Sequence, residues 1–150
     1  MANTFTSLHY HLTFSTKRRE RWFSEDIDDR VWSYLGGIAK NHEMVSHAIS
    51  GADDHIHVAV SVPAKLSISS CVQLLKGNSS KWIHETFPKM RGFSWQDGFG
   101  AFSVSKSVLP DVIEYVKRQR EHHAKMTFQE EFLSLLTKHG VEFDERYVWG

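Results

Sequence analysis

The sequence lacks the features that would place it in a membrane or in an oxidising compartment. No apolar run approaches the roughly 20 residues that span a bilayer, and the N-terminus has no charged-then-apolar signal pattern. Cys71 is the single cysteine, which excludes an intramolecular disulfide and a thiolate metal cluster. Its helical apolar surroundings indicate a core residue. We therefore expect a cytoplasmic protein without membrane contact.

Repeats, low-complexity tracts and Gly/Ser linkers are also absent, so nothing divides the chain into folding units. Its 150 residues fit one domain. Hydrophobic residues make up 41% of the chain and charged residues 24%, which is typical of a globular protein rather than a disordered one. We expect a single domain over residues 1–150.

An excess of either charge is missing too. The 18 Lys and Arg residues balance the 18 Asp and Glu residues, so the net charge gives no support to a nucleic-acid partner. Basic residues nevertheless gather in two places, and a local positive field can exist at zero net charge. These two basic clusters are Lys17, Arg18, Arg19 and Arg21, and Lys117, Arg118 and Arg120.

Apolar periodicity and turn signals predict an α+β domain. Strands are expected over residues 9–15, 44–50 and 55–62, with the last two joined by the turn Gly51-Ala52-Asp53-Asp54, and a further pair within residues 93–105. Helices are expected from a Ser24 N-cap to about residue 42, over 67–87, over about 110–123, and from a Thr127–Glu130 capping box to Gly140. The order matches a ferredoxin-like, RRM-like antiparallel sheet with its first two helices on one face.

The strand over 55–62 carries the first group of chemical interest. Its side chains alternate between two faces, so the isoleucine and valines share an apolar side while His55 and His57 point together to the other. Two imidazoles placed in this way can bind one divalent cation. Alone, such a pair in a chain with ten histidines is more often two ordinary surface or hydrogen-bonded histidines.

A polar intrusion in the helix over 110–123 supplies the second group. Val112, Tyr115, Val116 and Gln119 lie on one helix face, where an apolar residue would normally take the last position. Gln119 could bind a backbone group and Tyr115 could be a core aromatic. If this helix covers the histidine face of the sheet, however, the Gln119 oxygen becomes a third metal ligand and Tyr115 stands beside the ion.

These motifs together resemble the HUH single-tyrosine transposases of bacterial insertion sequences and their repeat-associated relatives. The resemblance rests on Asp54-His55-Ile56-His57 followed by Tyr115 and Gln119 in Tyr-x-x-x-Gln spacing. It extends to residues 10–18, 75–80 and 98–105 and so covers nearly the whole chain.

The resemblance implies that His55, His57 and Gln119 bind a divalent metal, and that Tyr115 is the nucleophile that cleaves and rejoins single-stranded DNA through a 5′-phosphotyrosine. Neutral imidazole and amide donors with open coordination positions suit Mg²⁺ or Mn²⁺, and no other cofactor is expected. The family also implies hairpin recognition and a homodimer in which the tyrosine helix of one subunit can complete the site of the other. His122 and His123 suit the negative end of a helix dipole and are left outside the metal site.

Two other functions remain open. The first is a metal phosphodiesterase in which water attacks and Tyr115 is structural. The second is a non-catalytic nucleic-acid-binding module, because ferredoxin-like sheets also serve as RNA platforms. A covalent adduct that depends on Tyr115 separates the transposase from the first, and metal-dependent activity separates it from the second.

Overall fold

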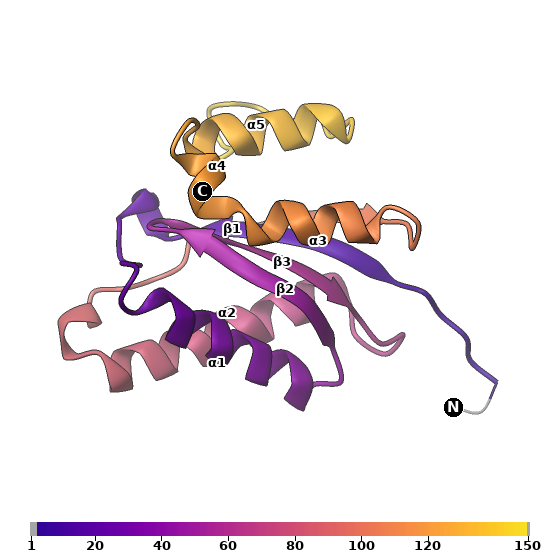
Figure 1. Ribbon diagram of the computed structural model, residues 1–150, viewed down its shortest axis with the longest axis horizontal. Helices are drawn as coiled ribbons and strands as arrows, with labels where there is room; N and C mark the ends of the chain where they lie inside the picture. The colour runs from indigo at the N-terminus through magenta and orange to yellow at the C-terminus, as the bar shows by residue number, and fades with distance from the viewer. Residues whose placement is uncertain (1–2, 150) are drawn as a thin grey trace.

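A computed structural model describes residues 3–149, in which a four-stranded antiparallel sheet separates two groups of helices (Figure 1). The strands, in the spatial order β2-β3-β1-β4, are β1 (His9–Ser15), β2 (Val45–Ala52), β3 (His55–Ser61) and β4 (Gly100–Val104). The helices are α1 (Asp28–Asn41), α2 (Ile68–Thr86), α3 (Leu109–Lys117), α4 (Gln119–His123) and α5 (Phe128–Lys138), with short 3-10 turns η1 (Lys17–Arg19) and η2 (Pro88–Met90). The predicted α+β class is confirmed.

The main core lies between the sheet and helices α1 and α2, which cover the same face (Figure 1). Alternation along β3 turns Ile56, Val58 and Val60 into this core, where each is fully buried. Cys71 on α2 is buried there as well, as predicted. The histidines of β3 therefore face the opposite layer, which is made of α3, α4 and α5 (Figure 1).

Helix α1 begins later than the sequence predicts. Its first residue is Asp28, and its N-cap is Ile27 rather than Ser24. The Ser24 carbonyl accepts hydrogen bonds from the Ile27 and Asp28 amides, so a separate turn precedes the helix. Asp28 and Asp29 occupy the first turn of the helix, where acidic side chains suit the positive end of its dipole.

The β2–β3 hairpin is tighter than predicted, with only Asp53 and Asp54 between the strands. Gly51 is a strand residue that pairs with Ile56, and not part of the turn. A Cβ at Gly51 would lie 2.1 Å from the His55 carbonyl oxygen. Glycine is therefore required by a close backbone approach directly beside the first histidine.

Substituting Gly51→Ala should destabilise the protein by about 3 kcal/mol, because the clash is with backbone that cannot move aside cheaply. Gly37→Ala is the matched control, since nothing lies within 4 Å of the added methyl group and alanine favours a helix. Denaturant unfolding measures both free energies. Equal stability of the two variants would contradict this account of Gly51.

The segment over residues 93–105 forms one strand, β4, rather than the predicted pair. Phe93 and Trp95 pack into the main core instead, and Trp95 makes only an isolated bridge to Thr16. The Gln96 side-chain oxygen accepts a hydrogen bond from the Ser15 amide at 2.7 Å. Side-chain packing in the core thus takes the place of the second strand that the aromatic pattern predicted.

The tyrosine helix is also divided. The predicted helix over 110–123 is broken at Arg118, whose φ of −100° and ψ of 23° separate α3 from α4. Tyr115 lies in the last turn of α3 and Gln119 is the first residue of α4, and the Gln119 side-chain amide still donates to the Tyr115 carbonyl at 3.1 Å. The one-turn spacing of the two residues survives the break.

Helix α5 follows the predicted Thr127–Glu130 capping box, which is fully formed, and Gly140 adopts a φ of 68° just beyond its end. Phe128, Phe132 and Leu136 on this helix pack with Phe102 of β4 in a second, smaller hydrophobic cluster. Among the residues that the structure describes, no helix is both long and apolar enough to cross a membrane.

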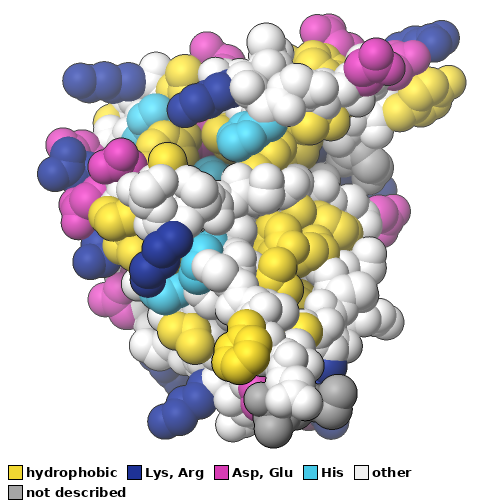
Figure 2. Space-filling view, turned by 90° about the vertical axis from the view of Figure 1, so that its right-hand side faces the viewer, with side chains coloured by type: hydrophobic (Ala, Val, Ile, Leu, Met, Phe, Trp, Pro, Cys, Tyr) yellow, Lys and Arg dark blue, Asp and Glu magenta, His cyan; other side chains and the backbone are white. Residues whose placement is uncertain are grey.

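The surface reflects the neutral net charge. On the face shown in Figure 2, acidic and basic side chains are intermixed around the margin, while hydrophobic and uncharged groups fill much of the centre. This face carries no continuous basic surface.

Candidate active site

Two buried histidines on β3 form the base of the site. His55 and His57 have no solvent exposure and lie on the sheet face opposite the main core. Each ring is fixed from behind through Nδ1. Asp54 Oδ1 lies 2.7 Å from His55 Nδ1, and His11 Nε2 lies 2.7 Å from His57 Nδ1. Both Nε2 atoms therefore point away from these partners, toward α4 and α5.

Tyr115 and Gln119 reach this pair from the covering helices. The Gln119 side-chain oxygen lies 3.3 Å from His55 Nε2, and Gln119 is fully buried. The Tyr115 ring lies 5.9 Å from the His57 ring, measured between centroids. The four predicted groups thus lie together within a single chain. Gln119 also makes the backbone contact that was the alternative interpretation, because its amide nitrogen is the donor to Tyr115.

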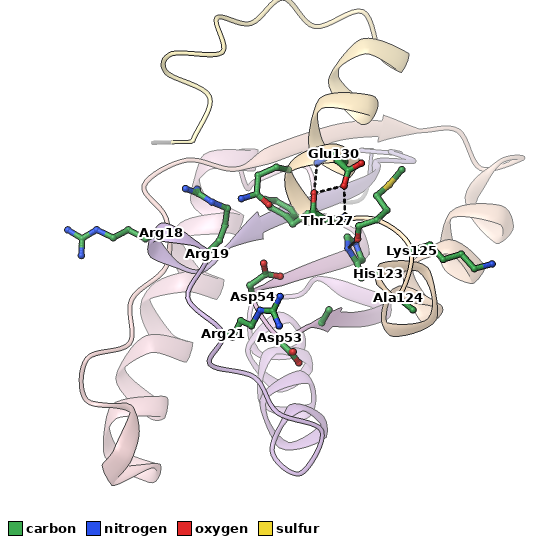
Figure 3. Close-up of a pocket in the computed structure, with 14 residues that line it drawn as sticks. Arg18, Arg19, Arg21, Asp53, Asp54, His123, Ala124, Lys125, Thr127 and Glu130 are labelled. Atoms are coloured by element: carbon green, nitrogen blue, oxygen red, sulfur yellow. Dashed lines mark hydrogen bonds between the residues drawn. The ribbon is translucent and has the colours of Figure 1, made fainter.

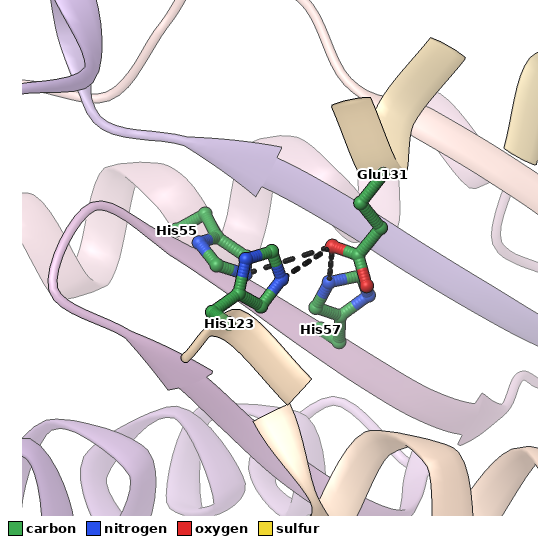
Figure 4. Close-up of side chains that lie close together, drawn as sticks. All are labelled: His55, His57, His123 and Glu131. Atoms are coloured by element: carbon green, nitrogen blue, oxygen red, sulfur yellow. Dashed lines mark hydrogen bonds and ion pairs between the residues drawn. The ribbon is translucent and has the colours of Figure 1, made fainter. Parts of the chain in front are cut away.

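Two further residues complete the cluster and were not predicted. Glu131 of α5 is almost fully buried, and its Oε1 accepts hydrogen bonds from His57 Nε2 at 2.7 Å and His123 Nε2 at 2.9 Å. Donor atoms of His55, His57, His123 and Glu131 all lie within 4.8 Å of one another (Figure 4). The Tyr115 hydroxyl donates to the other carboxylate oxygen of Glu131. His123, left out of the site on sequence grounds, is therefore part of the cluster.

His122, the other histidine left out of the site, remains at its edge. Its Nε2 is 3.5 Å from Glu131 Oε2 and makes no hydrogen bond with the described residues.

Burial keeps the inner histidines neutral. Desolvation, opposed by Glu131, lowers the pKa of His57 to about 4. Desolvation together with the neighbouring His57 lowers the pKa of His11 to about 3. Both rings are therefore uncharged near pH 7, and a neutral imidazole is the form that binds a metal ion.

One hydrogen bond joins the Tyr115 hydroxyl, as donor, to the Glu131 carboxylate. Burial acts to raise the pKa of Glu131, but hydrogen bonds from His123 and His57 outweigh it and hold this pKa well below its usual range. Burial and the adjacent Glu131 carboxylate raise the pKa of Tyr115. The carboxylate is thus charged and the phenol protonated at neutral pH, so the phenol cannot ionise readily in this environment.

The donor set fits a divalent cation. Because Asp54 accepts from His55 Nδ1–H, the Nε2 atom of a neutral His55 ring carries a lone pair. This lone pair faces the Gln119 oxygen, whose orientation is set by the amide's bond to Tyr115, and Glu131 Oε1 lies 3.7 Å away. These three acceptor atoms converge with no hydrogen between His55 Nε2 and either oxygen, although Glu131 Oε1 also accepts hydrogens from His57 and His123. A cation would satisfy all three at once.

Residues of the first basic cluster lie beside the buried histidines, whereas Arg120 of the second basic cluster is neutralised by acidic partners. A pocket of about 600 Å³ is lined by Arg18, Arg19 and Arg21 and also by His123, and Figure 3 shows Arg18 and Arg19 on one side with His123 and Lys125 on the other. From the second basic cluster, Arg120 is paired with Asp28 at 2.8 Å and Asp53 at 2.6 Å. Arg120 fixes α4 to the hairpin turn and to α1, whereas the three arginines of the first cluster share their pocket with Asp53, Asp54 and Glu130.

Comparison with known proteins places this arrangement in one family. Residues 4–119 match the family described as "Transposase IS200 like". The chain is 29% identical over 127 residues to the transposase for insertion sequence element IS200 of Salmonella typhimurium. This alignment covers 81% of this chain and 82% of the relative. It is 23% identical over 119 residues to the ISDra2 transposase TnpA of Deinococcus radiodurans, which covers 76% and 85% of the two chains.

Solved structures agree on the fold. A crystal structure of a candidate transposase from Deinococcus radiodurans superposes with a TM-score of 0.65 at 23% identity, covering 78% of this chain and 94% of the other. A REP-associated tyrosine transposase bound to a REP hairpin superposes with a TM-score of 0.61 at 12% identity, covering 83% and 73%. Since the family match spans most of the sequence and includes His55, His57, Tyr115 and Gln119, the chain belongs to the IS200-like transposase family.

Proposed function

We propose that this transposase cleaves and rejoins single-stranded DNA through a covalent 5′-phosphotyrosine at Tyr115, with a divalent ion bound by His55, His57 and Gln119. One observation carries the proposal: the Tyr115 hydroxyl and both histidines contact the same buried carboxylate. A nucleophile and a metal-binding group therefore share one pocket, as phosphoryl transfer requires.

The residues define how the reaction would proceed. The Tyr115 oxygen would attack the phosphorus, and the bond to the 3′ oxygen of the preceding nucleotide would break, leaving a free 3′ hydroxyl. The new phosphodiester conserves the energy of the broken bond, so a second DNA end can reverse the step without ATP. A bound Mg²⁺ or Mn²⁺ would polarise the phosphate and help the leaving oxygen to depart. The raised pKa of Tyr115 makes a nearby positive charge necessary for the phenol to react at neutral pH.

A single chain already brings Tyr115 to its own histidines, so the geometry supports assembly of the site within one protomer. The homodimer implied by the family would then pair two complete sites, and exchange of tyrosine helices between them is not needed for cleavage. Light scattering of the purified chain measures its oligomeric state directly.

The arginines of the pocket of about 600 Å³ support a path for the DNA backbone through it. Arg18, Arg19 and Arg21 line it, and His123 joins it to the metal-binding cluster. Arginine side chains suit phosphate oxygens. We assign the single-stranded segment next to the hairpin to this pocket, consistent with the REP hairpin bound by a structural relative.

The test is incubation with Mn²⁺ and an end-labelled single strand that contains an imperfect palindrome. A protein–DNA adduct that resists denaturant is expected with the single strand, and none is expected with EDTA or with a fully paired duplex. Cleavage without an adduct would favour the water-dependent phosphodiesterase. Metal-independent binding without cleavage would favour the non-catalytic module.

A further inference from the structure

We infer that Glu131 and His123 bind the divalent ion directly, together with His55 and His57, so that the metal site contains three imidazoles and a carboxylate. This inference rests on the proposed metal site and extends it by two ligands. Both residues lie beyond residue 119, where the family match ends. The additional ligands are thus carried by a part of the chain outside the matched segment.

The geometry places the four donors around one point. Glu131 Oε1 lies 2.7 Å from His57 Nε2, 2.9 Å from His123 Nε2 and 3.7 Å from His55 Nε2. The His123 side chain is 8% exposed and the Glu131 side chain 1%, so neither is a mobile surface group. The donors come from β3, α4 and α5, so all three elements fix the cluster (Figure 4).

His123 is positioned for ligation in the same way as the strand histidines. Its Nδ1 lies 2.7 Å from the Met126 carbonyl oxygen, which accepts the Nδ1 hydrogen, so the ion would take the place of the Nε2 hydrogen that contacts Glu131. A second bond of this kind is the usual support for a metal-binding histidine. Three imidazoles in the cluster therefore present Nε2 inward, each with a partner at Nδ1.

Electrostatics favours the same assignment. A buried carboxylate is costly unless hydrogen bonds or a positive charge compensate it, and without an ion the His57 and His123 hydrogens serve this purpose. Asp54 and Glu131 are the acidic groups that contact the histidine pair, while Arg18, Arg19 and Arg21 line the neighbouring pocket and Arg120 is paired with Asp28 and Asp53. A divalent ion would supply the compensating charge. It would also weaken the hydrogen bond between Glu131 and the Tyr115 hydroxyl.

The donor types predict the metal. Imidazole-rich sites prefer first-row transition ions to Mg²⁺, which prefers oxygen ligands. An ion with about six ligands keeps room for the Gln119 oxygen and one phosphate oxygen after these four donors bind. We expect Mn²⁺ to bind at least about tenfold more tightly than Mg²⁺.

The test measures metal binding by the DNA-free protein. Calorimetry should show one Mn²⁺ per chain, and electron spin-echo spectra of the Mn²⁺-loaded protein should show three coordinated imidazole nitrogens. Glu131→Gln keeps the size of the side chain and should weaken Mn²⁺ binding by at least about tenfold, and His123→Ala should remove one imidazole signal. Exposed Glu142→Gln and partly exposed His42→Ala are the matched controls, and circular dichroism in EDTA verifies that each variant is folded.

The outcomes separate this inference from the proposed function. Two imidazole signals and unchanged Mn²⁺ affinity in Glu131→Gln would overturn the inference and leave the site of His55, His57 and Gln119 intact. Failure of the unmodified protein to bind any divalent ion would overturn both. The spectrum of the unmodified protein decides between two and three imidazoles even if a variant does not fold.

Discussion

Tyr115→Phe should abolish the covalent protein–DNA adduct and lower strand cleavage by at least about 10³-fold. The substitution removes one oxygen and keeps the aromatic ring, so the ring contacts with His11, His57 and His122 are retained. The substitution also removes the hydrogen bond from the hydroxyl to Glu131. The expected loss is therefore chemical and not a consequence of misfolding.

Tyr10→Phe is the matched control, because Tyr10 is a partly buried tyrosine that packs against the main core on β1. Its adduct should form at the rate of the unmodified protein. Metal affinity of Tyr115→Phe should be unchanged or tighter, since removal of the phenol leaves Glu131 free of one competing partner. An adduct of undiminished yield in Tyr115→Phe would assign the nucleophile to another residue.

His57→Ala should weaken Mn²⁺ binding by about 100-fold or more and eliminate both adduct formation and cleavage. His57 lies at the centre of the cluster, with His11 behind it and Glu131 in front. Its loss removes one metal ligand and one hydrogen-bond donor to the carboxylate. EDTA treatment of the unmodified protein should reproduce the loss of activity, and added Mn²⁺ should restore it in the unmodified protein alone.

His47→Ala offers a comparison on the neighbouring strand, because His47 hydrogen-bonds Ser61 and does not contact the cluster. It should retain metal binding and cleavage. Cleavage by His57→Ala in the presence of EDTA would contradict a metal-dependent mechanism. Nucleic-acid binding that persists in His57→Ala and in EDTA, with no cleavage by the unmodified protein, would support a module that binds nucleic acid without cutting it.

The alternating pattern of β3 predicted that His55 and His57 share the sheet face opposite the core. A strict period of two separates Ile56, Val58 and Val60 from His55 and His57, and the unbroken pairing of β3 with β1 preserves this alternation. The helical spacing of Tyr115 and Gln119 was equally informative. It survived the break at Arg118 because the two side chains remain one turn apart.

The other half of the site could not be predicted in the same way, because it depends on how α5 folds back over the sheet. In the sequence, Glu131 resembles one more acidic residue in the first turn of a capped helix. One signal was available: Phe128, Phe132 and Leu136 define an apolar stripe, and Glu131 lies beside it. It is a polar intrusion of the same kind as Gln119. His123 gave no comparable signal, since its place beside His55 is set by the turn between α4 and α5.

The errors in the fold have local physical causes. Gly51 is needed because the backbone of His55 lies against it, and not because it forms a turn. Aromatic residues at 93 and 95 have strand propensity but pack into the core as separate side chains. Neither error changed the predicted position of the histidines, because β1 and β3 form a continuous seven-residue ladder.

Peptide mass spectrometry of the trapped protein–DNA adduct tests the central claim most directly. After nuclease and protease digestion, the peptide that contains Tyr115 should carry a nucleotide joined through its 5′ phosphate, and the released DNA fragment should end in a 3′ hydroxyl. A modification at any other residue, or cleaved DNA with every peptide unmodified, would contradict the account.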